Sequence, residues 1–165
     1  MNEYEKLVPV ELRGYIDGIV ELARNNIERD GVLAPVAFVG TIGGNITVIG
    51  GLAYIEKDDA AKMIRKAAKQ TKADFVLHVD EGWLKHATSK AEVDALKENH
   101  GQVRDMPGRV DVVMFSLETR MGQFFDAPVR QPHGETYTFG ELKMQLMPDA
   151  EGRFMGLLPP LGKGH

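Results

Sequence analysis

The sequence predicts an α+β fold, with a mostly antiparallel sheet of about five to seven strands and two main helices packed on one face. Two observations support this prediction. Apolar residues recur with helical spacing in two segments before residue 75, and strand-like patterns cluster after it. Strands that follow helices, instead of alternating strictly with them, favour α+β. The helix expected between two strand segments allows one parallel or split pairing.

The size and composition of the chain suit one globular domain. It has 165 residues, of which 43% are hydrophobic and 27% charged. We expect a single domain over residues 1–158 and a flexible tail, rich in proline and glycine, over residues 159–165. The tail contributes no predicted element.

Charge and cysteine content exclude several classes of function. The chain has no cysteine, which excludes disulfides, thiolate metal sites and a cysteine nucleophile, and which fits a cytoplasmic protein. The net charge of -4 argues against broad nucleic-acid binding, which needs a basic face. No stretch approaches the ~18 consecutive apolar residues that a membrane helix needs, so we expect no membrane association.

Residues 10–29 have the pattern of an amphipathic helix. Gly31 is placed to end it, since glycine readily adopts the left-handed conformation just past a helix. The apolar stripe consists of Leu12, Ile16, Ile19, Ala23 and Ile27. We expect this helix to cover the core.

Residues 34–39 and 46–49 are short apolar runs joined by a glycine-rich turn, which predicts a β-hairpin. A phosphate-binding loop is excluded, because such a loop needs a following helix and a Lys-Ser/Thr pair. Gly50 and Gly51 should interrupt the second strand, which we expect to resume over residues 52–55.

A second helix is predicted through Thr71, with Asp58 or Asp59 as its cap. Its other side is the most basic surface of the chain: Lys62, Arg65, Lys66, Lys69 and Lys72. A solvated helix face and an anion- or nucleic-acid-binding surface over residues 62–72 both remain open.

Residues 75–79 predict a strand inside the sheet. Strand alternation places Phe75, Leu77 and Val79 on the face that we assign to the helices. Val76 and His78 then lie on the opposite face, which we expect to meet solvent, a ligand or another chain.

The end of this strand carries the candidate chemistry. His78, Asp80, Glu81 and His86 are the densest group of metal-capable side chains, and with a divalent ion they would form an open hydrolytic site. Their spacing matches no established zinc signature. The alternatives are metal-free acid–base use of His78 with Asp80 or Glu81, and a plain strand end that carries a hydrogen-bonded histidine. We therefore predict no cofactor and keep the metal as the alternative.

The nucleophile for such an enzyme is missing. Ser89 fits the first position of a helix-capping box that would start a short helix closed by Gly101. Ser116 alternates within a strand and is expected on the same side as His78. The lone Trp83 is either a core residue or a ligand-contacting or lid residue.

The second half of the chain predicts several more strands. Residues 110–117 form a strong one, which we place beside residues 74–80. The others are residues 121–125, 136–139, 142–146 and a final strand or hook at 153–158. Residues 130–134 contain two breakers and should form a surface loop with His133, Glu135 and Arg130 or Arg120 as a second polar group.

The run Ala73-Asp74-Phe75-Val76-Leu77-His78-Val79-Asp80-Glu81-Gly82-Trp83 resembles a motif of small bacterial and phage-associated proteins of unknown function. In these proteins a strand that ends in Glu-x-Trp follows a helix. Arg109-Val110-Asp111-Val112-Val113 is similar to the strand that comes after their polar loop. The resemblance implies that Glu81 and Trp83 form a paired feature with that loop as a lid, and it implies no activity.

Three hypotheses for function follow. The leading one is a non-enzymatic interaction domain that forms a homo-oligomer, with a dimer favoured, or binds a protein partner through an uncovered sheet face bearing Val76, Val112 and Met114. The second is a hydrolase-type enzyme centred on His78, Asp80 and Glu81. The third is an anion- or nucleic-acid-binding module that uses the basic helix face.

Overall fold

The computed structural model describes residues 2–84, 110–147 and 156–158 of the chain. Helices in this part are α1 (Glu3–Leu7), α2 (Val10–Asp30) and α3 (Lys57–Thr71), with a short 3-10 helix, η1 (Leu52–Tyr54). The strands are β1 (Val36–Gly40), β2 (Ile46–Ile49), β3 (Phe75–Leu84), β4 (Val110–Thr119), β5 (Gly122–Asp126), β6 (Arg130–His133), β7 (Thr136–Phe139) and β8 (Gln145–Leu146). None of the described helices is long and apolar enough to span a membrane.

Six strands form one antiparallel sheet in the order β2-β1-β3-β4-β5-β8, and β6 and β7 form a separate hairpin. The α+β class and the mostly antiparallel sheet are therefore confirmed. β4 lies beside β3, as predicted. β2 and β3 run parallel with β1 between them, since each is antiparallel to β1. The chain thus passes from β2 through α3 to β3, and β1 lies between these two parallel strands. This is the split pairing that the sequence allowed.

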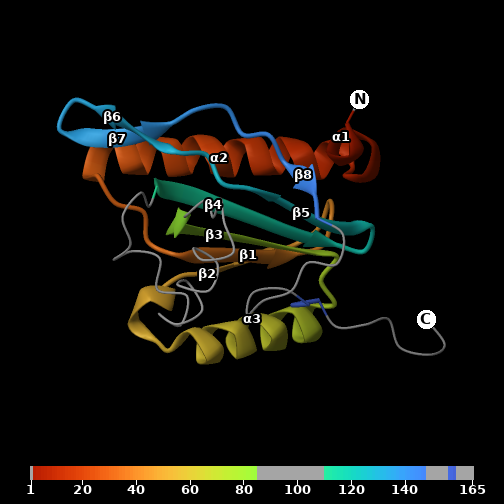
Figure 1. The fold of residues 1–165 in the computed structure, drawn as a ribbon. Helices are drawn as coiled ribbons and strands as arrows, with labels where there is room; N and C mark the ends of the chain where they lie inside the picture. The colour runs from red at the N-terminus through yellow and green to blue at the C-terminus, as the bar shows by residue number, and fades with distance from the viewer. Residues whose placement is uncertain (1, 85–109, 148–155, 159–165) are drawn as a thin grey trace, which may run out of the picture.

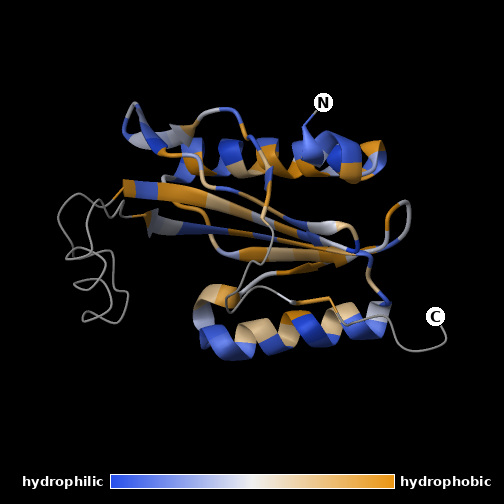
Figure 2. Cartoon of the chain, turned by 45° about the vertical axis from the view of Figure 1, so that its right-hand side comes forward, coloured by the Kyte–Doolittle hydropathy of each residue, from blue (hydrophilic) through white to orange (hydrophobic). Residues whose placement is uncertain are grey.

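The prediction that both main helices pack on one face is wrong. Figure 1 shows α2 above the sheet and α3 below it. One core joins α2 to the sheet face with Phe75, Leu77 and Val79. The other core joins α3 to the face with Val39 and Val76. Figure 2 shows hydrophobic residues along the central strands between these helices.

The physical reason is that β1 and β3 are apolar on both faces. A strand of this kind gains most by being covered on both sides, whereas a half-exposed strand alternates apolar with polar residues. The face expected to be uncovered is consequently buried at Val76 (1% exposed) and Val112 (0% exposed). Met114 is half-buried.

Local predictions hold best where one signal dominates. α2 is confirmed, and Gly31 ends it with a φ of 73°. The hairpin of β1 and β2 is confirmed as well. Residues 52–54 form η1 instead of a resumed strand, so that prediction is wrong. Gly51, at a φ of 71°, has already turned the chain out of the strand.

Three further expectations need correction. α3 begins at Lys57 with no side-chain cap, and Asp58 and Asp59 lie in its first turn, where their charge suits the helix dipole. β6 pairs with β7, so residues 130–133 are a strand although Pro132 lies within it. Only Gln145 and Leu146 of the strand expected at 142–146 pair with β5.

Several expectations concern residues outside the described part of the chain. These are His86, the short helix starting at Ser89, the tail at 159–165 and most of the final strand at 153–158.

Candidate functional site

β3 runs past the start of its neighbour β1, and this overhang creates the candidate site. The pairing of the two strands stops at Val36 and Val79, whereas residues 80–84 of β3 continue to pair with β4. The outer side of the overhang faces the segment that leads into β1 and the start of α3. A pocket of about 320 Å³ lies there, which we call the strand-end pocket. Its described lining is Leu33, Pro35, Leu52, Ala53, Ile55, Lys57, Ala60, His78, Asp80, Glu81 and Trp83.

The strand-end pocket therefore brings together the described candidate residues from the end of β3. His78, Asp80, Glu81 and Trp83 contribute to one cavity. The resemblance noted for Glu81 and Trp83 is compatible with this placement. What the sequence did not indicate is that Lys57, far away in the chain, lies with them.

His78 is a buried imidazole, 7% exposed, on the sheet face that α3 covers. It lies opposite Ser116 on β4 and opposite Ala37 on β1. Burial lowers the pKa of His78 to about 4, and the nearby positive charge of Lys57 acts in the same direction. At neutral pH the imidazole is thus uncharged, so it can both donate and accept a hydrogen bond.

Asp80 projects from the same strand face two residues further on. Its Oδ1 accepts a hydrogen bond of 2.7 Å from the backbone N–H of Glu81. Burial raises the pKa of Asp80, and the Glu81 N–H and the charge of Lys57 partly oppose that rise. Lys57 thus acts electrostatically on both polar groups of the pocket, although within the described residues it forms no ion pair shorter than 4.0 Å.

Glu81 has a structural role in addition to its place in the pocket. Its Oε1 accepts a hydrogen bond of 2.9 Å from the backbone N–H of Leu33, and its Oε2 lies 3.8 Å from Nη1 of Arg130. Burial raises the pKa of Glu81, while these two contacts act to lower it. The carboxylate therefore ties β3 to the segment before β1 and to β6.

Arg130 also anchors the β6–β7 hairpin. Its guanidinium lies 4.0 Å from the ring centroid of Tyr137 and donates to the carbonyl of Gly31 at 3.5 Å. The sequence placed Arg130 in a surface loop with His133 and Glu135. In the structure His133 and Glu135 are exposed, whereas Arg130 is half-buried and contacts Glu81.

Trp83 is 43% exposed, so the expectation of a core residue is wrong. It belongs to β3, opposite Asp111 of β4, and lines the pocket. Packing also explains why the residue before Trp83 is a glycine, Gly82. A Cβ at Gly82 would lie 2.4 Å from Cε of Met114, whose flexible side chain extends across this position. A larger residue at position 82 would therefore require the side chain of Met114 to move aside.

The described residues do not support the hypothesis of a metal site. No group of three or more His, Asp or Glu side chains in this part of the chain is arranged to hold a metal ion. Strand alternation explains why, because His78 and Asp80 leave one face of β3 and Glu81 leaves the other. The fourth predicted ligand, His86, lies outside the described residues.

The sequence marked no nucleophile, and the described lining of the pocket supplies no hydroxyl side chain. Ser116 lies opposite His78 on β4, and therefore on the same side of the sheet as predicted, yet it does not line the cavity. None of the described lining residues is a serine or threonine. The described residues thus supply groups that bind ligands and exchange protons, and no hydroxyl nucleophile is among the described lining.

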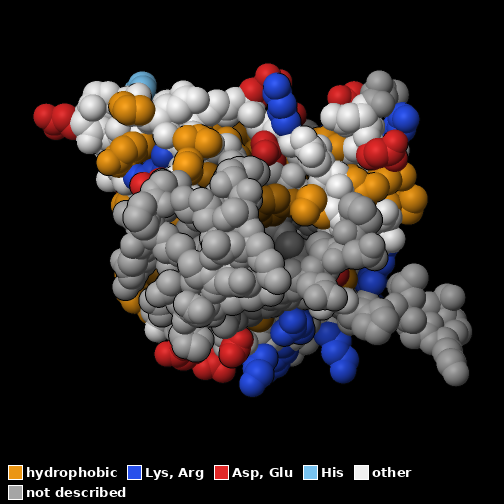
Figure 3. Space-filling model, viewed as in Figure 1, with side chains coloured by type: hydrophobic (Ala, Val, Ile, Leu, Met, Phe, Trp, Pro, Cys, Tyr) orange, Lys and Arg blue, Asp and Glu red, His pale blue; other side chains and the backbone are white. Residues whose placement is uncertain are grey.

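The basic face of α3 is exposed. Lys and Arg side chains gather along the lower edge in Figure 3, over the position of α3. The residues of that face are Lys62, Arg65, Lys66, Lys69 and Lys72, all exposed. Anion or nucleic-acid binding there stays a prediction, for which steep loss of binding with salt is the test.

Comparisons with known proteins assign no relationship. No protein-family model matches the chain, and neither the curated proteins nor the solved structures contain a significant match. The resemblance to small phage-associated proteins stays a prediction.

Proposed function

We propose that this protein binds a small organic molecule in the strand-end pocket. One observation carries the proposal: buried His78, half-buried Asp80, Lys57 and the partly exposed Trp83 line one cavity of about 320 Å³. Ligand pockets typically combine mostly apolar walls with a few convergent polar groups, and perturbed pKa values mark such sites.

The lining indicates the class of ligand. Leu52, Ile55 and Trp83 are the large apolar residues of the lining, and Trp83 is the aromatic one. Neutral His78 both donates and accepts hydrogen bonds, Asp80 accepts them and Lys57 donates them. A matching ligand has an apolar or aromatic body and one end that carries both donors and acceptors. The volume lies near the lower end of the usual range for ligand sites, roughly 300–1,000 Å³, which suits a metabolite-sized molecule.

Binding accounts for the geometry better than hydrolysis does. A hydrolase needs a nucleophile or an activated water within reach of its base. The described lining supplies a base but no hydroxyl nucleophile. Catalysis centred on His78, Asp80 and Glu81 is therefore the weaker proposal.

Thermal shift with a panel of small metabolites tests the proposal. The panel should contain aromatic amines, amino acids, nucleosides, sugars and simple anions, together with divalent metals. A ligand at a hundredfold excess over its Kd stabilises the folded state by about 2.7 kcal/mol, which raises the Tm by several degrees. We expect a shift with compounds that combine a ring with a polar end.

Matched variants place such a shift in the strand-end pocket. Trp83→Ala and Asp80→Asn should each weaken the ligand tenfold or more. Lys57→Ala should weaken it as well, whereas Lys62→Ala, an equal loss of charge on the same helix outside the pocket, should leave it unchanged. A shift that survives both Trp83→Ala and Asp80→Asn in folded protein, or a panel without any shift, would refute the proposal.

A further inference from the structure

The two flanks of α2 have different surroundings in the described structure. On one flank, Arg24 donates hydrogen bonds to the carbonyls of Phe139 and Gly140, at 3.3 and 3.1 Å. On the same flank, Glu28 accepts a bond of 3.1 Å from Thr138. The hairpin of β6 and β7, with the residues after it, therefore covers this side of the helix.

The opposite flank faces the edge of the sheet formed by β2. Tyr15 packs edge-to-face against Phe38 and Phe75, with centroid distances of 6.3 and 6.2 Å. The helical repeat places Leu22 on the same stripe, two turns further along. Leu22 is 56% exposed, so this stripe presents apolar surface to solvent.

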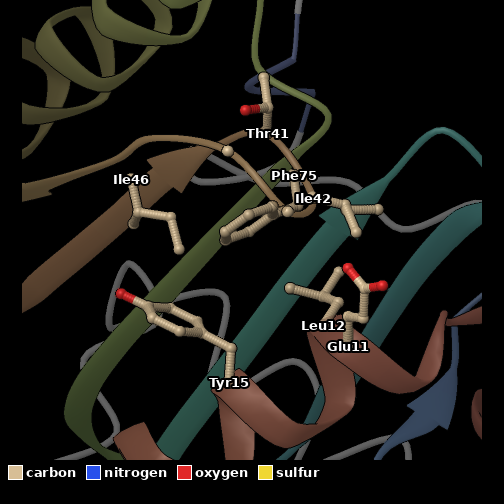
Figure 4. Close-up of a pocket in the computed structure, with 9 residues that line it drawn as sticks. Glu11, Leu12, Tyr15, Thr41, Ile42, Ile46 and Phe75 are labelled. Carbon is tan, nitrogen blue, oxygen red and sulfur yellow. The ribbon is translucent and has the colours of Figure 1, made fainter.

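A small apolar cavity opens on this flank. Its volume is about 190 Å³, and Figure 4 shows Tyr15 and Leu12 of α2 directed toward Ile46, Phe75 and Ile42. An apolar cavity of about 150 Å³ suffices to hold benzene, so this one has room for a large apolar side chain. The carboxylate of Glu11 stands at its rim, since a Cβ on Gly43 of the neighbouring turn would lie 3.2 Å from Oε2.

β2 is an edge strand of the sheet, and within the described residues no strand pairs with its outer edge. Thr41 N–H donates to the carbonyl of Asn45 at 3.2 Å. The alternation of an antiparallel ladder then turns the backbone groups of Ile46 and Val48 to the outer edge.

The short length of β2, four residues, is the one protection of that edge within the strand itself. Natural sheets usually block an edge with charge, proline or a bulge, and the four residues Ile46–Ile49 contain neither charge nor proline. Val48, which points to the α2 side like Ile46, is 58% exposed. We refer to the outer edge of β2 and the apolar flank of α2, with the cavity at their Ile46 end, as the groove.

We propose that this groove binds an extended peptide segment of a partner protein, which adds to β2 as a further strand. Strand addition of this kind uses backbone hydrogen bonds for affinity and pockets for alternate side chains for specificity. The cavity beside Tyr15 takes one large apolar residue such as Phe, Leu or Met. The carboxylate of Glu11 selects a Lys or Arg next to that residue.

Charge and side-chain size favour this occupant over a second copy of the chain. β2 contains no basic residue, so a second copy added through β2 would bring no opposite charge from that strand to Glu11. The side chains that β2 itself offers are β-branched and short, and Ile46 already lines the cavity. A basic peptide with one long apolar side chain satisfies both features.

A positional-scanning library of fluorescein-labelled hexapeptides, read by fluorescence polarisation against the full chain, tests the proposal. We expect a preference for Phe, Leu or Met at one position and for Lys or Arg beside it. N-methylation of the peptide residues that bond to β2 should abolish binding, and N-methylation of the alternating residues should not.

Two neighbouring residues of β2 provide the matched control. Val48→Lys places a charge in the groove and should lower the affinity of the best peptide tenfold or more. Thr47→Lys makes the same kind of change on the opposite face of the strand and should change it less than twofold. Glu11→Lys should reverse the preference for a basic residue.

Other outcomes would overturn the proposal. Equal effects of Val48→Lys and Thr47→Lys, or a library without positional preference, would exclude peptide addition at this groove. Self-association that Val48→Lys abolishes would assign the groove to a second copy instead. Because these variants lie outside the strand-end pocket, they leave the small-molecule shift as an independent measurement.

Discussion

His78 is a neutral imidazole held inside the sheet, and its environment makes folding depend on pH. Burial and Lys57 lower the pKa of His78 from the ordinary 6.5 to about 4. Between these two values the unfolded chain binds a proton that the folded chain does not. The free energy of unfolding therefore falls as the pH is lowered from 6.5 toward 4. Protonation of His78 accounts for about 3 kcal/mol of this fall.

We predict that His78→Gln removes this acid sensitivity. Urea unfolding followed between pH 7.5 and 4 should show the stability of the wild type falling more steeply than that of the variant. Asp80 and Glu81, whose pKa values are raised, act in the opposite direction and are present in both proteins. The comparison therefore isolates His78.

His133→Gln, on the exposed β6–β7 hairpin, is the control and should keep the wild-type profile. Parallel pH profiles for wild type and His78→Gln would show that the imidazole is not held neutral.

At the scale of the element, the hairpin of β1 and β2 depends on a close approach at Gly40. A Cβ at this position would lie 2.5 Å from the carbonyl oxygen of Asn45 and 2.9 Å from Cα of Ile46. Both atoms belong to the backbone, so neither can move aside as the end of a flexible side chain could. The glycine therefore permits the tight pairing that presents β2 at the edge of the sheet.

Gly40→Ala should consequently destabilise the protein by about 2 kcal/mol or more. Gly50→Ala is the matched control, because a Cβ at Gly50 meets nothing within 4 Å, and its effect should stay within about 0.5 kcal/mol. Chemical denaturation of both variants is the measurement. Equal stability of the two would contradict the close approach.

At the scale of the whole molecule, two cores share one sheet. Ile64 of α3 is fully buried in the core below the sheet, and Leu77 of β3 is fully buried in the core above it. The backbone of β3 runs between them. Loss of packing on one side therefore weakens the support for the other.

We predict that Ile64→Ala lowers the free energy of unfolding by about 2–5 kcal/mol while the protein still unfolds in one transition. Its neighbour Met63 is 44% exposed, so Met63→Ala should cost far less. Fluorescence of the single Trp83 and far-UV circular dichroism should give coincident curves. Separate transitions would mean that the two cores fold independently.

The sheet face through which we expected the protein to self-associate is not exposed. Val76 is covered by α3, and Val112 is fully buried. A homo-oligomer stays a prediction, and the groove beside β2 is now the surface on which to test it, with sedimentation of wild type and Val48→Lys as the measurement.

Most elements could be predicted because their signals are local. The apolar stripe of α2, the glycine that ends it and the alternation in β3 and β4 each depend on neighbours within a few residues. β6 was missed because Pro132 usually marks a break, although an unpaired edge position tolerates it. The expected strand at 52–55 failed because the left-handed Gly51 redirects the chain.

The candidate site could be predicted only in part. His78, Asp80, Glu81 and Trp83 were found because they follow one another on a single strand. Lys57 and Leu33 carry no local signal, since their roles arise from contacts with β3 that are distant in sequence.

By itself the sequence determined the α+β class, the main helices and strands and the strand end where polar groups concentrate, because periodicity and turn chemistry act over short distances. Only the tertiary structure decided that α3 covers the second face of the sheet, that Lys57 acts on His78 and Asp80, and that β2 lies at an edge beside an apolar flank of α2. These features depend on the path of the connection between β2 and β3. That path is set by packing between segments far apart in the chain, which no local pattern encodes.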